Sequence, residues 1–308
     1  MRIVSLLPSA TEIVFALGLG DELVGVTHEC DWPPEAATIP AVTRSTHDLG
    51  SRSSHEIDRL VGESVHGGSS LYELDEAALA ASQPDLILTQ ELCAVCAVGY
   101  RQVNEVAREI DADVSVVSLE PTSVEGILNS ISTIGAMTDA EDAAIDVVGE
   151  LRERLKKLET RLAQRRERGQ PPVRVVGLEW LDPPFAVGHW VPEQIRRAGG
   201  WDLLGREGDA SVRTNWQAVR EVDPEMLILM PCGFHLAETV AEWERIPRPA
   251  VWGELEAVRR GQVFAVDGSA YFSRPGPRVI DGIGLLAEIF DPDGFVETSP
   301  LGSWTPLL

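Results

Sequence analysis

The sequence has almost no lysine, and its acidic residues far outnumber its basic ones. Of 26 basic residues, 24 are arginines, and the two lysines are Lys156 and Lys157. Against 49 acidic residues this gives a formal net charge of −23. Nucleic acids and anionic membranes bind proteins through basic surfaces that neutralise phosphates. The charge balance therefore argues against both classes of partner.

Long apolar runs and an export signal are also missing. No run approaches the roughly 20 apolar residues that a membrane-spanning helix needs, which argues against membrane insertion. No basic region, short apolar segment and cleavage site precede the first apolar strand, Ile3 to Leu7. On this basis we expect a cytoplasmic protein, in which thiols stay reduced.

Signature motifs of enzymes are lacking as well. The chain has no Gly-x-Ser-x-Gly elbow, no P-loop and no His-Glu-x-x-His sequence. Gly18 and Gly20 are not part of a dinucleotide fingerprint, because they end a helix instead of opening one. The sequence therefore predicts no enzyme and no obligatory cofactor.

Apolar segments alternate with helical patterns in both halves of the chain. This alternation is typical of a parallel sheet covered by helices. At the N-terminus, the spacing of Ser9 and Glu12 predicts a helix that starts with a capping box. Between the halves, residues 139–168 predict one long charged helix with an apolar stripe of leucines. The predicted strands lie at 2–7, 23–27, 85–89, 113–118, 173–179, 226–230 and 263–266.

The predicted fold class is α/β. We expect two Rossmann-like lobes with parallel sheets, joined by a single long backbone helix, with a ligand cleft between the lobes. The expected boundaries are 1–134 for the N-terminal lobe, 135–170 for the connecting helix and 171–308 for the C-terminal lobe. Ligands of such folds bind at the carboxyl ends of the strands. We expect a monomer.

Several segments resemble, in order, those of one protein family. They are Asp31-Trp32-Pro33-Pro34, Gln83-Pro84-Asp85-Leu86-Ile87-Leu88, Asp182-Pro183-Pro184-Phe185, Ala198-Gly199-Gly200 and Ser273-Arg274-Pro275-Gly276-Pro277-Arg278. Together they resemble the helical-backbone solute-binding proteins of ABC importers, and within these the cobalamin-binding branch. The loop with Cys93 and Cys96 resembles a subgroup without a signal peptide. The resemblance implies a periplasmic or extracellular protein that binds cobalamin, or a related corrinoid or siderophore-like chelate.

A corrinoid is a flat, largely apolar ring edged with amides, so aromatic side chains suit it. Loops after predicted strands carry such side chains, and these are the expected ligand contacts: Trp32, Trp180, Phe185, Trp190, Tyr271 and Phe272. Trp180 also fits a core position, and both alternatives stay open. His189 is a candidate ligand for a bound metal, because neutral imidazole commonly binds metals; a hydrogen-bonding loop histidine is the alternative.

The cysteines support more than one interpretation. Cys93 and Cys96 form a Cys-x-x-Cys pair after a predicted strand, which is typical of redox chemistry or of half a metal site. Cys30, His28, Cys232 and His235 could complete a site for zinc or iron, and purely structural cysteines remain the third possibility. The alternative function is therefore a cytoplasmic metal- or redox-handling protein, perhaps an enzyme, on the same scaffold.

The resemblance also bears on a partner. Importer-type relatives dock on a permease through one exposed glutamate on each lobe. Glu76 lies within one residue of the expected place on the N-terminal lobe. At the corresponding position of the C-terminal lobe the chain has Ser273. The resemblance thus implies an ABC permease as partner, with Glu76 as its docking residue.

Overall fold

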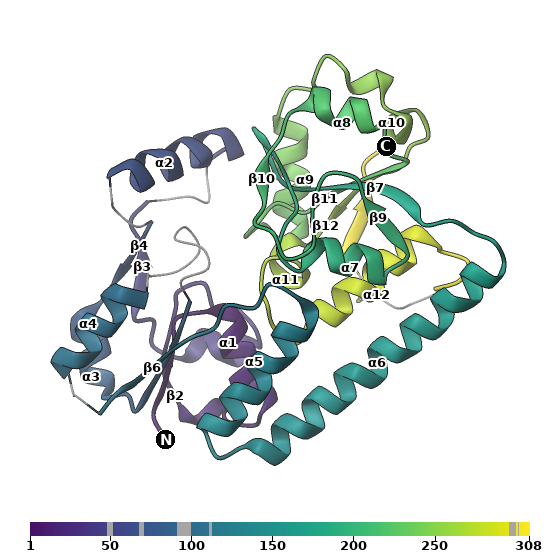
Figure 1. Cartoon of the computed structure of the whole chain (residues 1–308). Helices are drawn as coiled ribbons and strands as arrows, with labels where there is room; N and C mark the ends of the chain where they lie inside the picture. The colour runs from purple at the N-terminus through teal and green to yellow at the C-terminus, as the bar shows by residue number, and fades with distance from the viewer. Residues whose placement is uncertain (48–51, 68–70, 91–99, 111–112, 296–299, 301) are drawn as a thin grey trace. The chain divides into compact units, whose positions relative to one another are not determined.

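The computed structural model describes residues 1–47, 52–67, 71–90, 100–110, 113–295, 300 and 302–308 (Figure 1). The chain divides into two compact units, and each is assembled from separated stretches of sequence. The first unit comprises Met1–Arg52, Glu56–Glu120 and Gly126–Gly149. The second comprises Ser53–His55, Pro121–Glu125 and Glu150–Leu308.

The first unit is built on a parallel sheet with strand order β2-β1-β5-β6. Its strands are β1 (Ile3–Ser5), β2 (Leu23–Val26), β5 (Leu86–Thr89) and β6 (Ser115–Ser118). All neighbours pair in parallel, as predicted for this lobe. A separate antiparallel pair is formed by β3 (Thr43–Ser45) and β4 (Tyr72–Leu74).

Helices of the first unit pack on this sheet through apolar side chains such as Leu79 and Val103, which join Val4 and Ile87 in one core cluster. They are α1 (Pro8–Ala16), most of α2 (Ser54–Gly67), α3 (Glu76–Ser82), α4 (Tyr100–Ile110), most of α5 (Val124–Met137) and the start of α6 (Glu141–Glu167).

The predicted capping box at the start of α1 is wrong. The helix begins at Pro8, the N-cap is Leu7, and no side chain caps the N-terminus. Proline at the first helical position has a preset φ and lacks an N–H that would in any case have no partner there. The helix therefore starts before Ser9 and takes Ser9 into its first turn.

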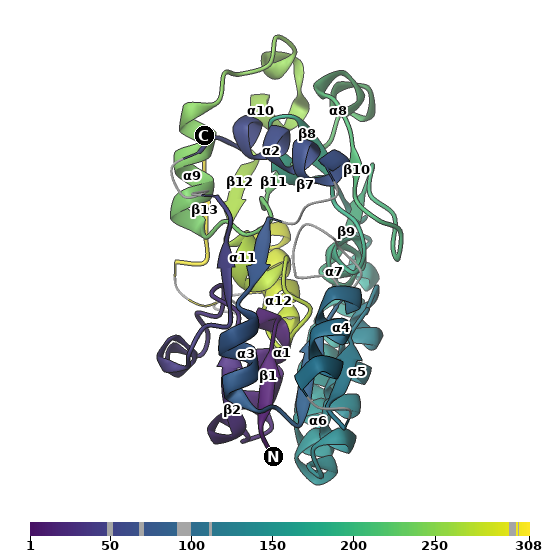
Figure 2. The ribbon, with the colours of Figure 1, turned by 90° about the vertical axis from the view of Figure 1, so that its left-hand side faces the viewer.

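The second unit has a larger, mixed sheet with strand order β10-β8-β7-β11-β12-β13, and β9 pairs with β7. Figure 2 shows β12, β11, β7, β8 and β10 following one another in this order. The strands are β7 (Val173–Leu181), β8 (Pro184–Ala186), β9 (Gly200–Asp202), β10 (Val212–Arg213), β11 (Met226–Leu229), β12 (Val263–Val266) and β13 (Trp304–Pro306).

Only the centre of this second sheet is parallel. β7, β11 and β12 run parallel, as the alternating pattern predicted, and β9 joins β7 in parallel. β8, β10 and β13 pair antiparallel with their neighbours. These antiparallel strands were not predicted, because they are only two or three residues long and show no period; β8 returns along β7 through a tight turn at Asp182-Pro183.

Helices cover the second sheet on an apolar core. Its cluster includes Val176 and Leu178 of β7, Leu227 of β11, Val263 of β12 and Trp243 of a covering helix. The helices are α7 (Val191–Arg197), α8 (Trp216–Val222), α9 (Leu236–Arg245), α10 (Glu256–Arg259), α11 (Gly268–Tyr271), α12 (Val279–Phe290) and the larger part of α6.

The long helix predicted at 139–168 is confirmed as α6. Its leucine stripe, Leu151, Leu155, Leu158 and Leu162, is buried. Charged side chains on the same helix bind neighbouring helices of the second unit: Arg154 pairs with Asp281 of α12, and Glu159 pairs with Arg197 of α7. Charged side chains that flank the leucine stripe therefore add polar contacts to its apolar packing.

Among the helices that the structure describes, none is both long enough and apolar enough to cross a bilayer.

A buried carboxylate fixes the turn after β9. Asp202 accepts backbone N–H bonds from Gly177 at 2.9 Å and Leu204 at 3.0 Å, and a further one from Gly205. Burial raises the pKa of the Asp202 carboxyl above 3.8, and the three N–H donors oppose this rise. Stability from such a group is complete below pH 3.8 and is lost as the pH rises through the raised pKa.

We therefore expect Asp202→Asn to destabilise the protein by about 1–3 kcal/mol at acid pH. The NH2 group of asparagine cannot accept a hydrogen bond, so at least one of the backbone N–H groups that Asp202 binds loses its acceptor. The loss should shrink as the pH rises, since only the wild type titrates. Urea unfolding from pH 3.5 to 8 measures this. Asp75→Asn, at an exposed helix cap, is the control, and a loss that grows with pH at Asp202 would contradict the prediction.

Candidate functional site

The carboxyl ends of β7, β11 and β12 meet at one edge of the second sheet. Backbone bonds join the chain segments at this edge: the Cys232 N–H after β11 donates to the Glu179 carbonyl of β7, and the Ser269 N–H after β12 donates to the Phe234 carbonyl after β11, each at 2.9 Å. The Ser273 hydroxyl donates to the Gly268 carbonyl at 2.9 Å. The end of β7 and the loops after β11 and β12 are therefore joined at the edge where α/β folds bind ligands.

Two aromatic rings lie at this edge. Trp180 near the end of β7 and Phe234 after β11 meet edge to face, with ring centroids 5.5 Å apart. Both side chains are half-buried. The Trp180 indole N–H donates to the Ser54 carbonyl at 3.1 Å. Trp180 is thus neither a core residue nor fully exposed, which keeps it among the candidate ligand contacts.

Tyr271 ends α11, in the loop region that follows β12. Its ring is half-buried, and the guanidinium of Arg278 lies 5.9 Å from the ring centroid. Hydrogen bonds from α7 fix its backbone: the buried Gln194 donates from Nε2 to the carbonyls of Tyr271 at 3.1 Å and Val279 at 2.8 Å. The position of the Tyr271 ring therefore depends on α7.

Phe272 and Trp190 are packed inside the second unit. Their exposed fractions are 2% and 6%. The Trp190 indole N–H donates to the Phe272 carbonyl at 2.9 Å. Burial of this extent favours a packing role over the ligand contact that we expected from the loop position of Trp190.

Phe185 and His189 lie on the chain that returns from the carboxyl edge. Phe185 of β8 is half-buried, pairs with Trp180 in register, and has the Arg213 guanidinium 5.8 Å from its ring. His189 comes after β8 has run back along β7. It has a φ of 53°, and its N–H donates to the Asp209 carbonyl at 2.6 Å. Phe185 therefore lies with Trp180, Phe234 and Tyr271, and we call these four residues the aromatic edge. His189, in contrast, does not follow the carboxyl end of one of the parallel strands.

In the first unit, the loop after β2 carries the predicted residues His28, Cys30 and Trp32. His28 Nδ1 lies 2.7 Å from the Thr43 hydroxyl. Cys30 is buried, with its Sγ 3.0 Å from the Thr11 hydroxyl. Trp32 is 47% exposed. The first two side chains are held within their unit, and only Trp32 offers a large apolar surface.

The predicted metal ligands are distributed over both units. His28 and Cys30 belong to the first unit, Cys232 and His235 to the second, and Cys93 and Cys96 lie outside the described residues. His235 Nδ1 lies 3.0 Å from the Asp267 carboxylate. Within the described part of the chain, no three His, Cys, Asp or Glu side chains gather into a group that could hold a metal ion.

The two positions connected with permease docking differ in chemistry. Glu76, the first residue of α3, is exposed, and its helix is capped by Asp75, whose Oδ1 accepts the Ala78 N–H at 2.9 Å. Ser273 is half-buried, and the Gly233 N–H points to its hydroxyl at 3.3 Å. Glu76 is therefore available at the surface, while Ser273 mainly ties two loops of the aromatic edge together.

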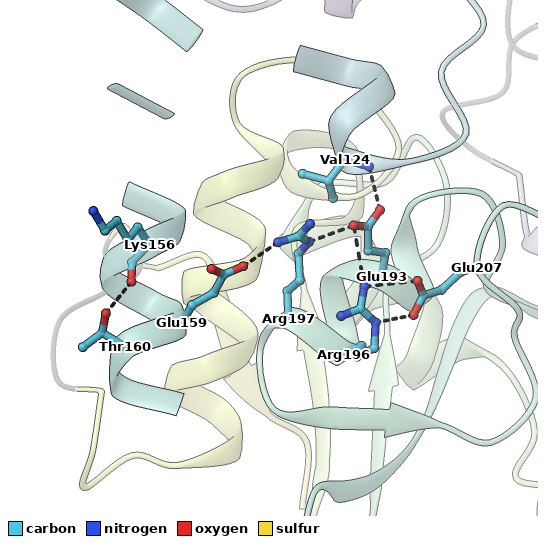
Figure 3. A network of polar contacts seen from close by, with 8 residues as sticks. All are labelled: Val124, Lys156, Glu159, Thr160, Glu193, Arg196, Arg197 and Glu207. Atoms are coloured by element: carbon cyan, nitrogen blue, oxygen red, sulfur yellow. Dashed lines mark hydrogen bonds and ion pairs between the residues drawn. The ribbon is translucent and has the colours of Figure 1, made fainter. Parts of the chain in front are cut away.

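An ion-pair network centred on one buried carboxylate, that of Glu193, joins α7 to neighbouring helices (Figure 3). The Glu193 carboxylate is buried and accepts the Val124 N–H and the Arg197 Nε–H, each at 2.8 Å. Arg197 also donates to Glu159 of α6 at 2.6 Å, and Arg196 pairs with Glu207. α7 is thereby fixed to α6 and to the first residue of α5.

Sequence reasoning missed Ser54, Glu242 and Glu193. Ser54 and Glu242 are 188 residues apart and directly hydrogen-bonded. A signal was present for Glu242, which occupies the apolar face of α9 with Thr239 and Trp243, where an acidic residue needs a partner. For Ser54 the only signal was its place at the start of a helical pattern.

Comparison with known proteins gives concordant results. The profile of the periplasmic binding protein family matches residues 3–270. An ABC transporter substrate-binding lipoprotein of Bacillus subtilis, YvrC, is 26% identical over 302 residues, covering 96% of this chain and 82% of that protein. The periplasmic vitamin B12 binding protein BtuF of Vibrio cholerae has a similar fold, with TM-score 0.69, 21% identity and coverage of 94% of this chain and 96% of that one. A periplasmic heme binding protein from Pseudomonas aeruginosa gives TM-score 0.69, 20% identity and coverage of 95% and 93%.

Burial lowers the pKa of the His189 imidazole below 6.5. The ring is therefore neutral at pH 7. The contribution of the neutral ring to stability is lost as the pH falls from 6.5 through the lowered pKa. We expect an NMR titration to give a midpoint below 6.5 for the His189 ring signals, assigned by their loss in His189→Gln. A midpoint at or above 6.5 would show that the imidazole is solvated.

Proposed function

This chain belongs to the periplasmic binding protein family, and on that premise we propose that it binds cobalamin or a related corrinoid as the substrate-binding protein of an ABC uptake system. Proteins of this family bind solutes and are not enzymes, in agreement with the absence of catalytic motifs from the sequence. The proposal goes beyond family membership in naming the ligand class.

The aromatic edge of the second sheet is the observation that carries the proposal. The rings of Trp180 in β7, Phe234 after β11 and Tyr271 in α11 are half-buried, on segments joined by hydrogen bonds. Phe185 pairs with Trp180 on the neighbouring strand. Half-buried rings keep one face available for a flat apolar ligand, while the surrounding hydroxyls and backbone groups suit its polar rim.

Corrinoids and porphyrins are both flat metal chelates, and similar proteins bind vitamin B12 or heme. Cobalamin is favoured because the segments that resemble the cobalamin-binding branch include the loops around Phe185 and Tyr271. His189, neutral at pH 7, is proposed as a metal contact only if the ligand reaches the loop after β8.

We propose an ABC permease as partner, with Glu76 in docking, and a monomeric binding protein. The cytoplasmic location that the sequence predicted is not supported by the comparisons, since family members are periplasmic or extracellular. We therefore propose an extracytoplasmic site of action, which fractionation of the native cells tests.

Calorimetric titration with cyanocobalamin, and separately with hemin, tests the ligand. We expect one cyanocobalamin per chain and weaker binding of hemin. Tyr271→Ala should weaken binding by about 1–3 kcal/mol, or roughly 5- to 150-fold, through loss of ring stacking. Trp201→Ala, which removes an exposed ring on β9, should leave the affinity unchanged. Equal affinities for the wild type and Tyr271→Ala would remove Tyr271 from the site.

Metal analysis tests the alternative role of the cysteines. A chelate brings its own metal, so we expect the purified protein to hold much less than one zinc or iron per chain, and Cys93→Ser to bind cyanocobalamin as the wild type does. Stoichiometric zinc or iron that is lost in Cys93→Ser would instead support metal or redox handling on this scaffold.

A further inference from the structure

A short segment from the N-terminal third of the sequence, Ser53–His55, groups with the second unit. It lies at the aromatic edge and contacts both Trp180 of β7 and Glu242 of α9. We refer to these three residues as the strap.

The strap is anchored by a buried carboxylate. Glu242 is 1% exposed, and its Oε1 accepts the Ser54 N–H at 2.7 Å and also the Ser54 hydroxyl. Arg245 donates to the other oxygen, Oε2, at 2.9 Å. Burial of a carboxylate is costly unless it is paired and hydrogen-bonded. Both oxygens of Glu242 are satisfied, and one of them is satisfied by the strap.

The strap also binds the candidate ligand contact Trp180. The Ser54 carbonyl accepts the indole N–H at 3.1 Å, and Ser54 itself is 0% exposed. His55 Nδ1 lies 3.7 Å from the Asp182 carboxylate in the turn after β7, a partly exposed pair of small energetic weight. The donor of Trp180 is therefore engaged by the strap.

The contacts of Ser54 are suited to reversible release. Its bonds to Glu242 and Trp180 are polar, and water can replace polar partners at a small net cost in free energy. Segments held in this way open locally while the core of the protein stays folded. When the strap leaves, Arg245 remains as the partner of Glu242, so the carboxylate is never left without a counter-charge.

We infer that the strap gates the aromatic edge: with Ser54 bound to Glu242 it restricts access to Trp180, and its release exposes the ring to ligand. This inference rests on the proposed function for the identity of the ligand. The gate itself is a property of the chain and can be measured without any ligand.

Hydroxyl-radical footprinting with mass spectrometry provides that measurement, because it reports the reactivity of individual tryptophans. The variants are Ser54→Ala, which removes only the hydroxyl bond, and Glu242→Gln, which removes the charge and keeps the shape. Glu244→Gln, at an exposed position of the same helix, is the matched control. Trp216, in the apolar cluster of the second unit, is the internal reference.

We expect Trp180 to be labelled at least threefold faster in Ser54→Ala and Glu242→Gln than in the wild type, with no change in Glu244→Gln or at Trp216. Unchanged labelling of Trp180 in both variants would overturn the gate. Faster labelling of Trp216 together with Trp180 would indicate general loosening of the unit and would overturn it too. Ser54→Ala retains every charge, so the test stands even if Glu242→Gln folds poorly.

Stopped-flow binding of cyanocobalamin then separates the gate from the proposed function. A gated site predicts faster association in Ser54→Ala, by about the factor seen in labelling, and unaltered association in Glu244→Gln. Equal association rates despite faster labelling would overturn gating of the ligand. If cyanocobalamin and hemin bind to no variant, the proposed function fails, whereas the labelling result still decides whether the strap covers Trp180.

Discussion

The second unit depends on the buried carboxylate of Glu193. It binds the first N–H of α5 and the guanidinium of Arg197, and Arg197 in turn binds α6. The adjacent residue Gln194 links α7 to the aromatic edge, because its side chain donates a hydrogen bond to the carbonyl of Tyr271. A charge removed from water requires several well-placed partners, so α7 has little freedom to shift, and the ring at the end of α11 is positioned as a consequence.

Polar bonds to backbone groups organise the rest of the edge. Asp202 joins β7 to the turn after β9, Ser273 joins the loops after β11 and β12, and Trp190 fixes the carbonyl of Phe272. Each bond connects segments distant in sequence, and together they define where half-buried rings can lie. The aromatic surface is thus held by its hydrogen-bonded frame as much as by apolar packing.

The α/β class and the long helix could be predicted from the sequence, because apolar periodicity extends over whole strands and over the leucines from Leu151 to Leu162. The start of α1 was misplaced by one competing residue, Pro8. The antiparallel strands β8, β10 and β13 escaped because two or three residues carry no period. Trp190 looked like a loop residue and is buried, since burial is decided by Phe272, 82 residues away. The contact of Ser54 with Glu242 could not be predicted, because the burial of Glu242 in α9 calls for a partner but does not identify one 188 residues away.

The second unit is assembled from three separate stretches of the chain, and this limits where the chain can be divided by recombination or by truncation. A polypeptide of residues 150–308 would lack Pro121–Glu125 and Ser53–His55, which belong to the same compact unit. Glu193 would lose the Val124 N–H, and Glu242 would lose both donors of Ser54. Two buried carboxylates would then stand at a newly made surface. Residues 150–308 alone therefore do not make up a complete folding unit, although the sheets of the two units are separate.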